Sequence, residues 1–351
     1  MNMQTVSPAA QTWLTPFAPR PLLRNGHLQT LAGNFLPRNV SLPEAESLQV
    51  EVEGPVAGPG SGYGPSFVLC HCHWQPVEVR ARRLTVVLVH GLEGSSSSQY
   101  MLGNAARALA AGFNVVRMNM RSCGGTDEIC PTIYHSGRSG DVAAVLAEIV
   151  ERHHVESVAL VGYSMGGNLV LKFAGEAAAA PPPQLKAVVG VSPLMDLAIS
   201  SAALHEPQNR IYEWHFLRNM IARVRRRAQL FPEIYGSAEI QKIRTMRLFD
   251  EHIVARYGGF TGADDYYHSV ASSQYADQLS IPTLILHSAD DPFIRLLPST
   301  CDVLAANSNV TFVETQRGGH CAFLESAGPG YDGRWAEKTL LGFLQEISDG
   351  S

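Results

Sequence analysis

A serine between two glycines is the strongest chemical signal in this sequence. Residues 162–166 (GYSMG) follow an apolar run, SVALV, and precede a helix-like segment that starts GNLVLK. A G-x-S-x-G pattern at a strand-to-helix junction is typical of a nucleophile elbow, a sharp turn that leaves no room for side chains at the flanking positions. The N-terminus of the next helix would favour negative charge beside the serine. The alternative is a chance match in a chain rich in glycine and serine; we predict that Ser164 is a nucleophile.

A glycine-rich loop could supply the donors that such a nucleophile needs. Residues 90–94 (HGLEG) follow the apolar run 84–89 (LTVVLV). In acyl transfer the carbonyl oxygen becomes an oxyanion, and losing one of its hydrogen-bond donors costs roughly 3 kcal/mol of barrier. We expect the backbone N–H groups of Leu92 and Met165 to be these donors, against the alternative of an ordinary glycine-rich turn.

A serine also needs a base, and the base needs an acid that orients it. Asp290 and Asp291 follow the apolar run 281–287, and His320 follows the run 309–315 and a glycine pair. The chain has 13 histidines, and His320 is favoured by its order in the chain, its strand-end position and the preceding glycines. Pro292 favours an extended conformation at the residue before it. We therefore predict Asp291 as the acid, with Asp290 as the alternative or as a turn or capping residue.

The elements that would position these residues alternate between strand and helix. Short apolar, β-branched runs are typical of buried strands, and apolar residues at helical spacing indicate amphipathic helices. Strands are predicted at 48–53, 66–74, 84–89, 113–118, 157–162, 187–191, 281–287 and 309–315, and helices at 104–111, 141–153, 164–177 and 335–347. The first two strands should form an antiparallel hairpin. The remaining alternation predicts an α/β fold with a mostly parallel, doubly wound sheet.

The same pattern divides the chain. Residues 1–45, rich in Pro, Asn and Gly, are expected to form an irregular N-terminal arm. Residues 46–193 and 276–351 should form the α/β core. Residues 194–275 hold charges, aromatics and helical patterns but no convincing strand, so we predict a helical lid inserted into the core.

Composition limits the classes of function. The chain has 351 residues, 45% hydrophobic and 17% charged, with a formal net charge of −5, which fits a globular protein and gives no indication of a nucleic-acid partner. Its six cysteines are scattered, unlike those of a small disulfide scaffold. Cys70 and Cys72 alternate with His71 and His73, but in a strand the two pairs face opposite ways, so we predict no metal site and no cofactor.

The sequence carries no signal for membrane insertion. Its first residues lack a positive segment followed by an apolar run, and no uncharged apolar stretch is long enough to span a bilayer, so we expect a cytoplasmic protein. Within 212–231, apolar residues at helical spacing lie beside Arg218, Arg223, Arg225, Arg226 and Arg227. One interpretation of this basic amphipathic segment is that it contacts a membrane surface. The favoured interpretation is a lid helix with a solvated basic face.

Motifs along the whole chain resemble the YheT-type branch of the α/β-hydrolases, related to plant embryogenesis-associated hydrolases and yeast medium-chain ester synthases. The matching segments are 25–30 (NGHLQT), 90–94, 121–125 (RSCGG), 134–137 (YHSG), 162–168, 249–250 (FD), 265–267 (DYY), 290–293 (DDPF) and 319–320 (GH). The resemblance implies the α/β-hydrolase fold, esterase activity on short- or medium-chain acyl groups, and Asp291 as the acid. One departure is Ser122, where the family usually has glycine. His27 and Gln29 could line the mouth of the site or form a polar clasp.

Together these features predict a serine esterase that binds a small-molecule or lipid-like acyl ester. The same residues would serve an acyltransferase in which an alcohol replaces water. A non-catalytic binding protein on this scaffold is a further alternative, disfavoured because Ser164, Asp291, His320 and the oxyanion loop are all retained.

Overall fold

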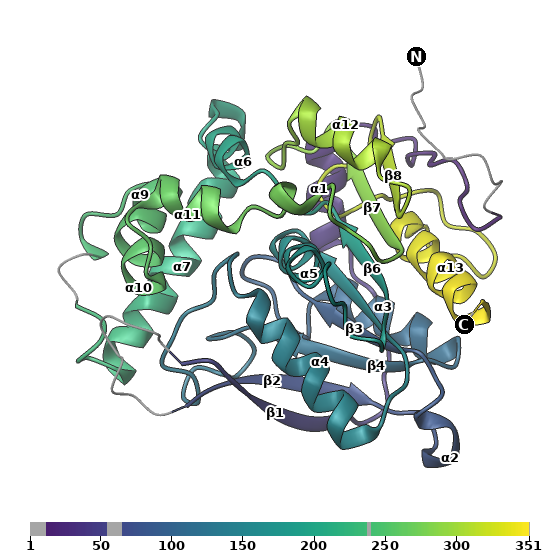
Figure 1. The fold of residues 1–351 in the computed structure, drawn as a ribbon. Coiled ribbons are helices and arrows are strands. Elements are labelled where there is room, and N and C mark those ends of the chain that lie inside the picture. The colour runs from purple at the N-terminus through teal and green to yellow at the C-terminus, as the bar shows by residue number, and fades with distance from the viewer. Residues whose placement is uncertain (1–11, 55–64, 237–239, 351) are drawn as a thin grey trace.

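The computed structural model describes residues 12–54, 65–236 and 240–350, and its centre is one eight-stranded sheet (Figure 1). The spatial order of the strands is β1-β2-β4-β3-β5-β6-β7-β8. Their bounds are β1 (Glu46–Val52), β2 (Ser66–His73), β3 (Thr85–Val89), β4 (Asn114–Asn119), β5 (Val158–Tyr163), β6 (Leu185–Val191), β7 (Thr283–Ser288) and β8 (Val310–Thr315). Each of the eight predicted strands overlaps one of these.

The pairing of the strands confirms the predicted α/β class. β1 and β2 form an antiparallel hairpin, and β2 also pairs antiparallel with β4. From β4 to β8 all neighbours are parallel. Every residue of β3, β4, β5 and β7 is buried, as expected for parallel strands covered on both faces.

Helices cover both faces of the sheet. On one face, α3 (Gln99–Ala110) and α13 (Trp335–Asp349) pack in one hydrophobic cluster with side chains of β3, β5 and β6. On the other face, α4 (Ser139–His153), α5 (Met165–Glu176) and α12 (Pro298–Ala306) contribute to a second cluster. α4 supplies Val142, Val145, Leu146 and Ile149, the apolar positions that its period predicts.

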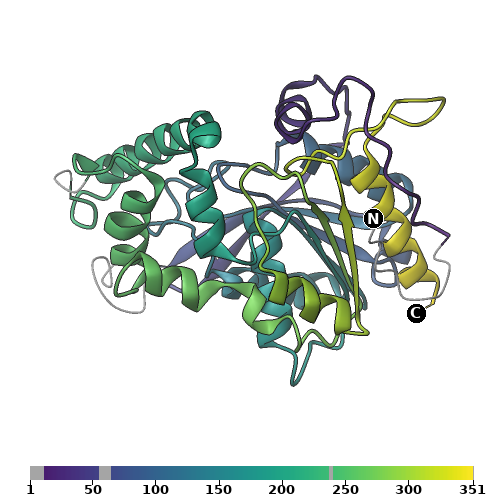
Figure 2. The same ribbon diagram turned by 90° about the horizontal axis from the view of Figure 1, so that it is seen from above.

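Between β6 and β7 the described residues contain helices but no strand. These insertion helices are α6 (Leu197–Leu204), α7 (Arg210–Leu230), α9 (Met246–Phe249), α10 (Arg256–Gly258) and α11 (Ala263–Val270), with short η1 (Pro207–Asn209), η2 (Asp250–Ala255) and η3 (Ser272–Tyr275). Most of them contribute to a third hydrophobic cluster, which also includes Ile133, Phe293 and Ile294 from outside the insertion. Figures 1 and 2 show α7, α9, α10 and α11 gathered on one side of the molecule and α13 on the opposite side. That they act as a lid remains a prediction.

The prediction of an irregular arm is wrong for part of it, because residues Gly26–Phe35 form helix α1. Asn25 caps this helix: its side-chain oxygen accepts hydrogen bonds from the N–H groups of His27 at 2.9 Å and Leu28 at 3.3 Å. Asparagine and glycine together suggested a loop, whereas here they are a cap and the first helical residue. A further short helix, α2 (Val77–Arg80), follows β2.

No helix in the described part of the chain is both long and apolar enough to cross a membrane. In β2, Cys70 and Cys72 are buried in the sheet core, while Nε2 of His73 lies 3.0 Å from a guanidinium nitrogen of Arg117.

Ser122 lies in a strained turn directly after β4. The turn is closed by the Cys123 N–H, which donates to the Met120 carbonyl at 3.0 Å, and Ser122 has a φ of 54°. This left-handed region favours glycine, the residue that the resembling family usually has here. The Ser122 hydroxyl is buried and has no hydrogen-bond partner among the described residues.

We predict that Ser122→Gly stabilises the protein. Relief of the left-handed strain, worth roughly 1 kcal/mol, and removal of an unpaired buried hydroxyl should outweigh an unfolded-state entropy cost of about 0.4–1 kcal/mol. The expected rise in the free energy of unfolding is about 1 kcal/mol, measured by urea denaturation. Ser192→Gly is the matched control: Ser192 also has a positive φ, of 44°, but its hydroxyl accepts a hydrogen bond from the Cys321 N–H, so no gain is expected. Equal stabilisation by both substitutions would contradict this account.

Candidate active site

Ser164 occupies a strained turn between β5 and α5. Its backbone angles are φ 55° and ψ −118°, a conformation that side chains rarely adopt. The turn is possible because its neighbours are glycines: a Cβ atom on Gly162 would lie 2.1 Å from the Gly166 carbonyl oxygen, and one on Gly166 would lie 2.4 Å from that of Val89. Ser164 thereby sits at the N-terminus of α5, as the sequence predicted.

The loop after β3 lies against this serine. A Cβ on Gly91 would come within 3.1 Å of the Ser164 Cβ. Buried His90 holds the loop, because its Nε2 accepts a hydrogen bond from the Met120 N–H at 3.1 Å, while its Nδ1 contacts the Gly91 carbonyl at 2.8 Å. Burial lowers the pKa of His90 to about 4, so it is neutral. Within the described residues the N–H groups of Leu92 and Met165 have no acceptor, as oxyanion donors require.

The structure brings His320 and Asp291 into direct contact. His320 Nδ1 lies 2.8 Å from Asp291 Oδ2, and the Asp291 side chain is only 1% exposed. The other oxygen, Oδ1, accepts hydrogen bonds from the N–H groups of Phe293 and Ile294 at 3.1 and 2.9 Å. Ser164, Asp291 and His320 follow β5, β7 and β8, so all three lie at the carboxyl edge of the sheet.

Asp290 has a different set of partners. Its Oδ1 accepts hydrogen bonds from the Ser288 hydroxyl at 2.7 Å and from the Gly319 N–H at 2.9 Å. Asp290, in the loop after β7, therefore binds the loop after β8 at Gly319, the residue before His320. This is the turn role that we expected for Asp290 if Asp291 was the acid.

The charges of the pair support each other. Burial alone would raise the pKa of Asp291, but the adjacent His320 and its hydrogen bond bring it below its ordinary value. Burial alone would lower the pKa of His320, but the Cys321 sulfur and the Asp291 carboxylate raise it well above its ordinary value. A base held in this way has the orientation and the basicity that acyl transfer needs.

The contact between the serine and the base is not formed. Between these two described residues there is no hydrogen bond from Ser164 Oγ to His320 Nε2, and Nε2 lies 3.6 Å from the Sγ of Cys321 instead. Catalytic hydrogen bonds are often long or misaligned in the absence of substrate. Cys321, which the sequence analysis missed, could have been noticed only from its place next to His320.

Helix α1 packs against the loop that carries His320 and holds it in place. The Thr30 hydroxyl accepts a hydrogen bond from the His320 N–H at 2.8 Å and donates to the Gly26 carbonyl at 2.7 Å. Gln29 is fully buried and clasps Leu324, donating to its carbonyl at 3.0 Å and accepting from its N–H at 2.8 Å. Of the two roles weighed for Gln29, the clasp is the one observed. His27 instead faces the insertion, with Nδ1 3.2 Å from the Tyr212 hydroxyl.

Helix α7 reaches the loop of the candidate oxyanion donor Leu92 through an ion pair. Glu93, which follows Leu92 and has a φ of 57°, binds Arg223 through two contacts of 3.0 and 3.2 Å. The Tyr134 hydroxyl donates to the same carboxylate at 2.6 Å and accepts from the Glu93 N–H at 3.1 Å. Arg227 is also buried and donates to the carbonyls of Asp127 and Cys130. The expectation of a solvated basic face is therefore wrong for two of its five arginines, Arg223 and Arg227, which bind inward.

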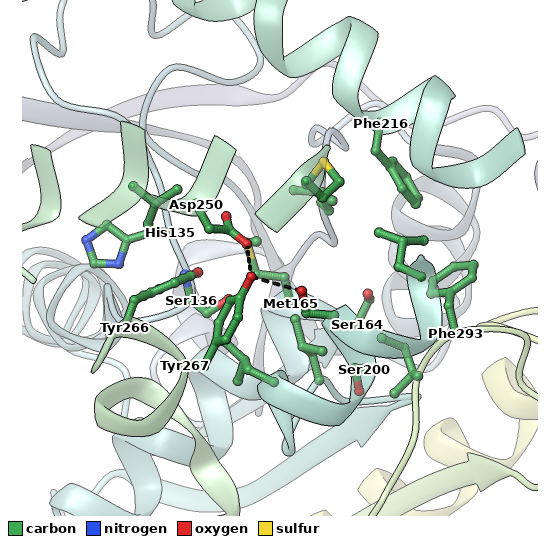
Figure 3. Close-up of a pocket in the computed structure, with 18 of the residues that line it drawn as sticks. His135, Ser136, Ser164, Met165, Ser200, Phe216, Asp250, Tyr266, Tyr267 and Phe293 are labelled. Atoms are coloured by element: carbon green, nitrogen blue, oxygen red, sulfur yellow. Dashed lines mark hydrogen bonds between the residues drawn. The ribbon is translucent and has the colours of Figure 1, made fainter. Parts of the chain in front are cut away.

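A largely apolar cavity opens beside Ser164 (Figure 3). The space not filled by atoms, counting the open mouth, is about 740 Å³. Its walls come from the oxyanion loop, the start of α5, residues 134–136 and the insertion helices. The lining includes Leu92, Met165, Leu194, Leu197, Leu204, Phe216, Met220, Met246, Val254, Phe293 and Ile294.

Across the described ranges no group of three or more His, Cys, Asp or Glu side chains is placed to hold a metal ion. Cys70 to His73 therefore form no such group.

Comparisons with known proteins agree with this geometry. Residues 85–236 match the pattern of the alpha/beta hydrolase fold family. Protein abhd-3.2 of Caenorhabditis elegans is 31% identical over 263 residues, covering 73% of this chain and 68% of that one. YheT of Escherichia coli (strain K12) is 28% identical over 314 residues, covering 88% of this chain and 87% of YheT. The chain belongs to the α/β-hydrolase family, in the branch of YheT.

Two further similar proteins are a phospholipase and an esterase of solved structure. Phospholipase ABHD3 of Mus musculus is 28% identical over 254 residues, which is 70% of this α/β-hydrolase but only 60% of that protein's length. The solved structure of the Pyrococcus furiosus esterase Pf2001 covers 89% of the chain and 97% of its own, with a TM-score of 0.54 and 15% identity. At that identity the likeness concerns the fold alone.

We predict that Arg223 positions the oxyanion loop of this α/β-hydrolase. Arg223→Gln leaves the Glu93 carboxylate without its cation and loosens the loop that carries the Leu92 N–H. We expect kcat to fall about tenfold, less than the 10²–10³ for outright loss of a donor, with KM nearly unchanged. Steady-state kinetics on one ester would measure this.

Arg226→Gln is the matched control on the same helix, because Arg226 is half exposed and its nearest carboxylate oxygens lie 3.8 and 3.9 Å away. Arg223→Lys, which keeps the charge but not the two-point contact, should give an intermediate kcat. Equal kcat values for the Arg223→Gln and Arg226→Gln enzymes would rule out the positioning role.

Proposed function

We propose that this protein hydrolyses carboxylic esters of short to medium acyl chain through a triad of Ser164, His320 and Asp291. The protein is an ester hydrolase of the α/β-hydrolase family, and the proposal concerns its catalytic residues and substrate class. The observation that carries it is the buried His320–Asp291 pair at the sheet edge that also holds the strained Ser164.

The proposed reaction has two halves. Ser164 Oγ attacks the ester carbonyl carbon while His320 Nε2 accepts its proton, and the N–H groups of Leu92 and Met165 bind the resulting oxyanion. Collapse of this intermediate breaks the ester C–O bond, and His320 returns the proton to the departing alcohol. Water then attacks the acyl-enzyme with His320 again as base, releasing the acid and restoring Ser164. Asp291 keeps Nδ1 protonated so that Nε2 faces the serine.

The substrate class follows from the cavity. An apolar wall of leucine, methionine and phenylalanine side chains suits an alkyl chain. Met220 of α7 and Met246 of α9 line the cavity together with Leu92 and Met165 of the core, so the insertion supplies part of the wall. Its proposed role is therefore chain discrimination and exclusion of water.

Location and membrane contact stay predictions. We expect the cytoplasm, on the sequence argument given above. Ile211 and Trp214 on α7 are 65% and 60% exposed, and they are the side chains that would meet a membrane surface in any peripheral contact.

We predict that a fluorophosphonate probe labels Ser164 and that Ser164→Ala abolishes both labelling and ester hydrolysis. The measurement is mass spectrometry of the labelled peptide, together with rates on p-nitrophenyl esters of increasing acyl length. Running the series with added alcohol identifies a transferase, because the acyl ester of that alcohol would then exceed the free acid. Labelling that persists in Ser164→Ala would move the nucleophile elsewhere. A folded enzyme that turns over no ester would favour a binding protein.

We further predict that Asp291→Asn cuts kcat by about 10⁴ with little change in KM, as loss of the orienting acid does in a well-studied triad. Because the pKa of His320 is raised above its ordinary value and the base must be neutral, wild-type kcat/KM should fall with decreasing pH along a limb above about pH 6.5. Asp291→Asn should move that limb to lower pH, as measured by the pH profile of kcat/KM.

Asp290→Asn is the matched neighbour for this test. Its amide oxygen can still accept from Ser288 and Gly319, so both kcat and the pH limb should stay close to wild type. If Asp290→Asn instead lost the activity that we expect Asp291→Asn to lose, Asp290 would be the acid and our assignment would be wrong by one residue.

A further inference from the structure

A polar network interrupts the apolar wall of the cavity. The Tyr267 hydroxyl, on α11, lies 2.6 Å from Asp250 Oδ2, at the start of η2, and 2.9 Å from the Ser201 hydroxyl, on α6. All three residues line the same cavity as Ser164, and Figure 3 shows Asp250 linked to the Tyr267 hydroxyl beside that cavity. The network accounts for the matching segments FD and DYY, which the triad does not use.

Hydrogen-bond accounting shows what the network lacks. Tyr267 has one hydroxyl proton and donates it to Asp250, so Ser201 must donate to Tyr267. Asp250 Oδ1 then has no hydrogen-bond partner in the described parts of the chain, and Asp250 lies on the wall of the cavity. The network therefore presents two acceptors to the cavity, Asp250 Oδ1 and the Ser201 oxygen.

The surroundings of Asp250 select a neutral donor. Burial raises the pKa of Asp250 to about 7, although the Tyr267 hydrogen bond and Arg247 both act to lower it. The guanidinium of Arg247 binds Asp264 at 2.8 Å, on the outside. A substrate cation would lose its water of hydration on entering the apolar cavity. It would gain only one partly protonated carboxyl group as a partner, which does not offset that cost. A hydroxyl group loses far less on burial and needs one acceptor.

We propose that Asp250, Tyr267 and Ser201 form a subsite that binds a hydroxyl group carried by the ester substrate. This inference rests on the proposed esterase function and specifies its substrate as a hydroxylated chain. Asp250 Oδ1 accepts the hydroxyl proton, and the Ser201 oxygen offers a second acceptor. The location also fits, because η2 is a π-helical segment, and such segments are frequent at functional sites.

A structural brace is the competing role, because the network also joins α6, η2 and α11. The two roles differ in what they change. A brace would alter the rates on all esters together, whereas a subsite alters the ratio between a hydroxylated ester and its plain parent.

The test compares p-nitrophenyl octanoate with octanoates that carry one hydroxyl at successive carbons. For each hydroxylated ester, the measured quantity is its kcat/KM divided by the kcat/KM of the plain ester. For at least one hydroxylated ester, this ratio should be up to roughly tenfold higher in the wild type than in Asp250→Leu, since that is about the worth of one hydrogen bond. Asp250→Leu removes the acceptor while Tyr267 keeps Ser201 as a partner. Tyr267→Phe removes the internal donor and leaves Oδ1 in place, so the ratio should hold or rise.

Ser200→Ala is the matched control, because Ser200 lines the same cavity but donates to the Arg295 carbonyl at 3.2 Å and lies outside the network. It should leave the ratio unchanged. Two results would contradict the subsite. One is a ratio of hydroxylated to plain ester that Asp250→Leu leaves unchanged. The other is an equal loss of kcat/KM on both esters in Asp250→Leu and in Tyr267→Phe. A trimethylammonium-bearing ester that is preferred over every hydroxylated one in an Asp250-dependent way overturns the hydroxyl assignment. Failure of the esterase function is distinguishable, because then plain octanoate itself is not cleaved in a Ser164-dependent way.

Discussion

The turn at Ser164 is the constraint on which the rest of the site depends. A left-handed serine between β5 and α5 is tolerated because three glycines leave room there: Gly162 and Gly166 close the turn, and Gly91 of the loop after β3 lies against the serine Cβ. Strand order makes this possible, since β3 and β5 are adjacent parallel neighbours and end together. The strain therefore costs stability locally, and the buried strands around it supply the packing that keeps it in place.

The two segments outside the sheet hold opposite halves of the site. Helix α1 fixes the histidine loop through Thr30, and its close approach requires glycines at both ends of the contact: a Cβ on Gly319 would lie 2.4 Å from the Gly26 carbonyl oxygen. Helix α7 binds the loop of the candidate oxyanion donor Leu92 through Arg223 and Glu93. Both helices also meet each other, since the rings of His27 and Tyr212 stack at 5.7 Å. The insertion is thus in contact with the loop of the candidate oxyanion donor Leu92 directly, and with the loop of the candidate base His320 through α1.

The sheet was predictable because its strands are short runs of β-branched residues bounded by turns, and that signal is local. The residues of the candidate triad could be picked out for the same reason, since each follows such a run; their roles remain predictions. Helix α1 was missed because the same two residues fit two structures. By composition Asn25 and Gly26 favour a loop, but asparagine is also a common residue at the start of a helix, and only packing decides between loop and helix. The Glu93–Arg223 pair and the Asp250–Tyr267 link could not be foreseen, because each joins residues whose separation in sequence carries no periodic signal.

Electrostatics explains why one histidine among 13 suits the role of base. His90, His135 and His287 are also buried, and burial lowers the pKa of each, to about 4 for His90 and His287. His287 lies close enough to Asp291 to be influenced by it, yet its Nδ1 has no partner in the described chain, so burial prevails. His320 differs because it has a hydrogen bond to a buried carboxylate. Together with the adjacent Cys321 sulfur, this carboxylate raises the pKa of His320, whereas burial lowers the pKa of the other three histidines. The contact between His320 and Asp291 forms because Asp290 and Thr30 hold the loop of His320 against the end of β7.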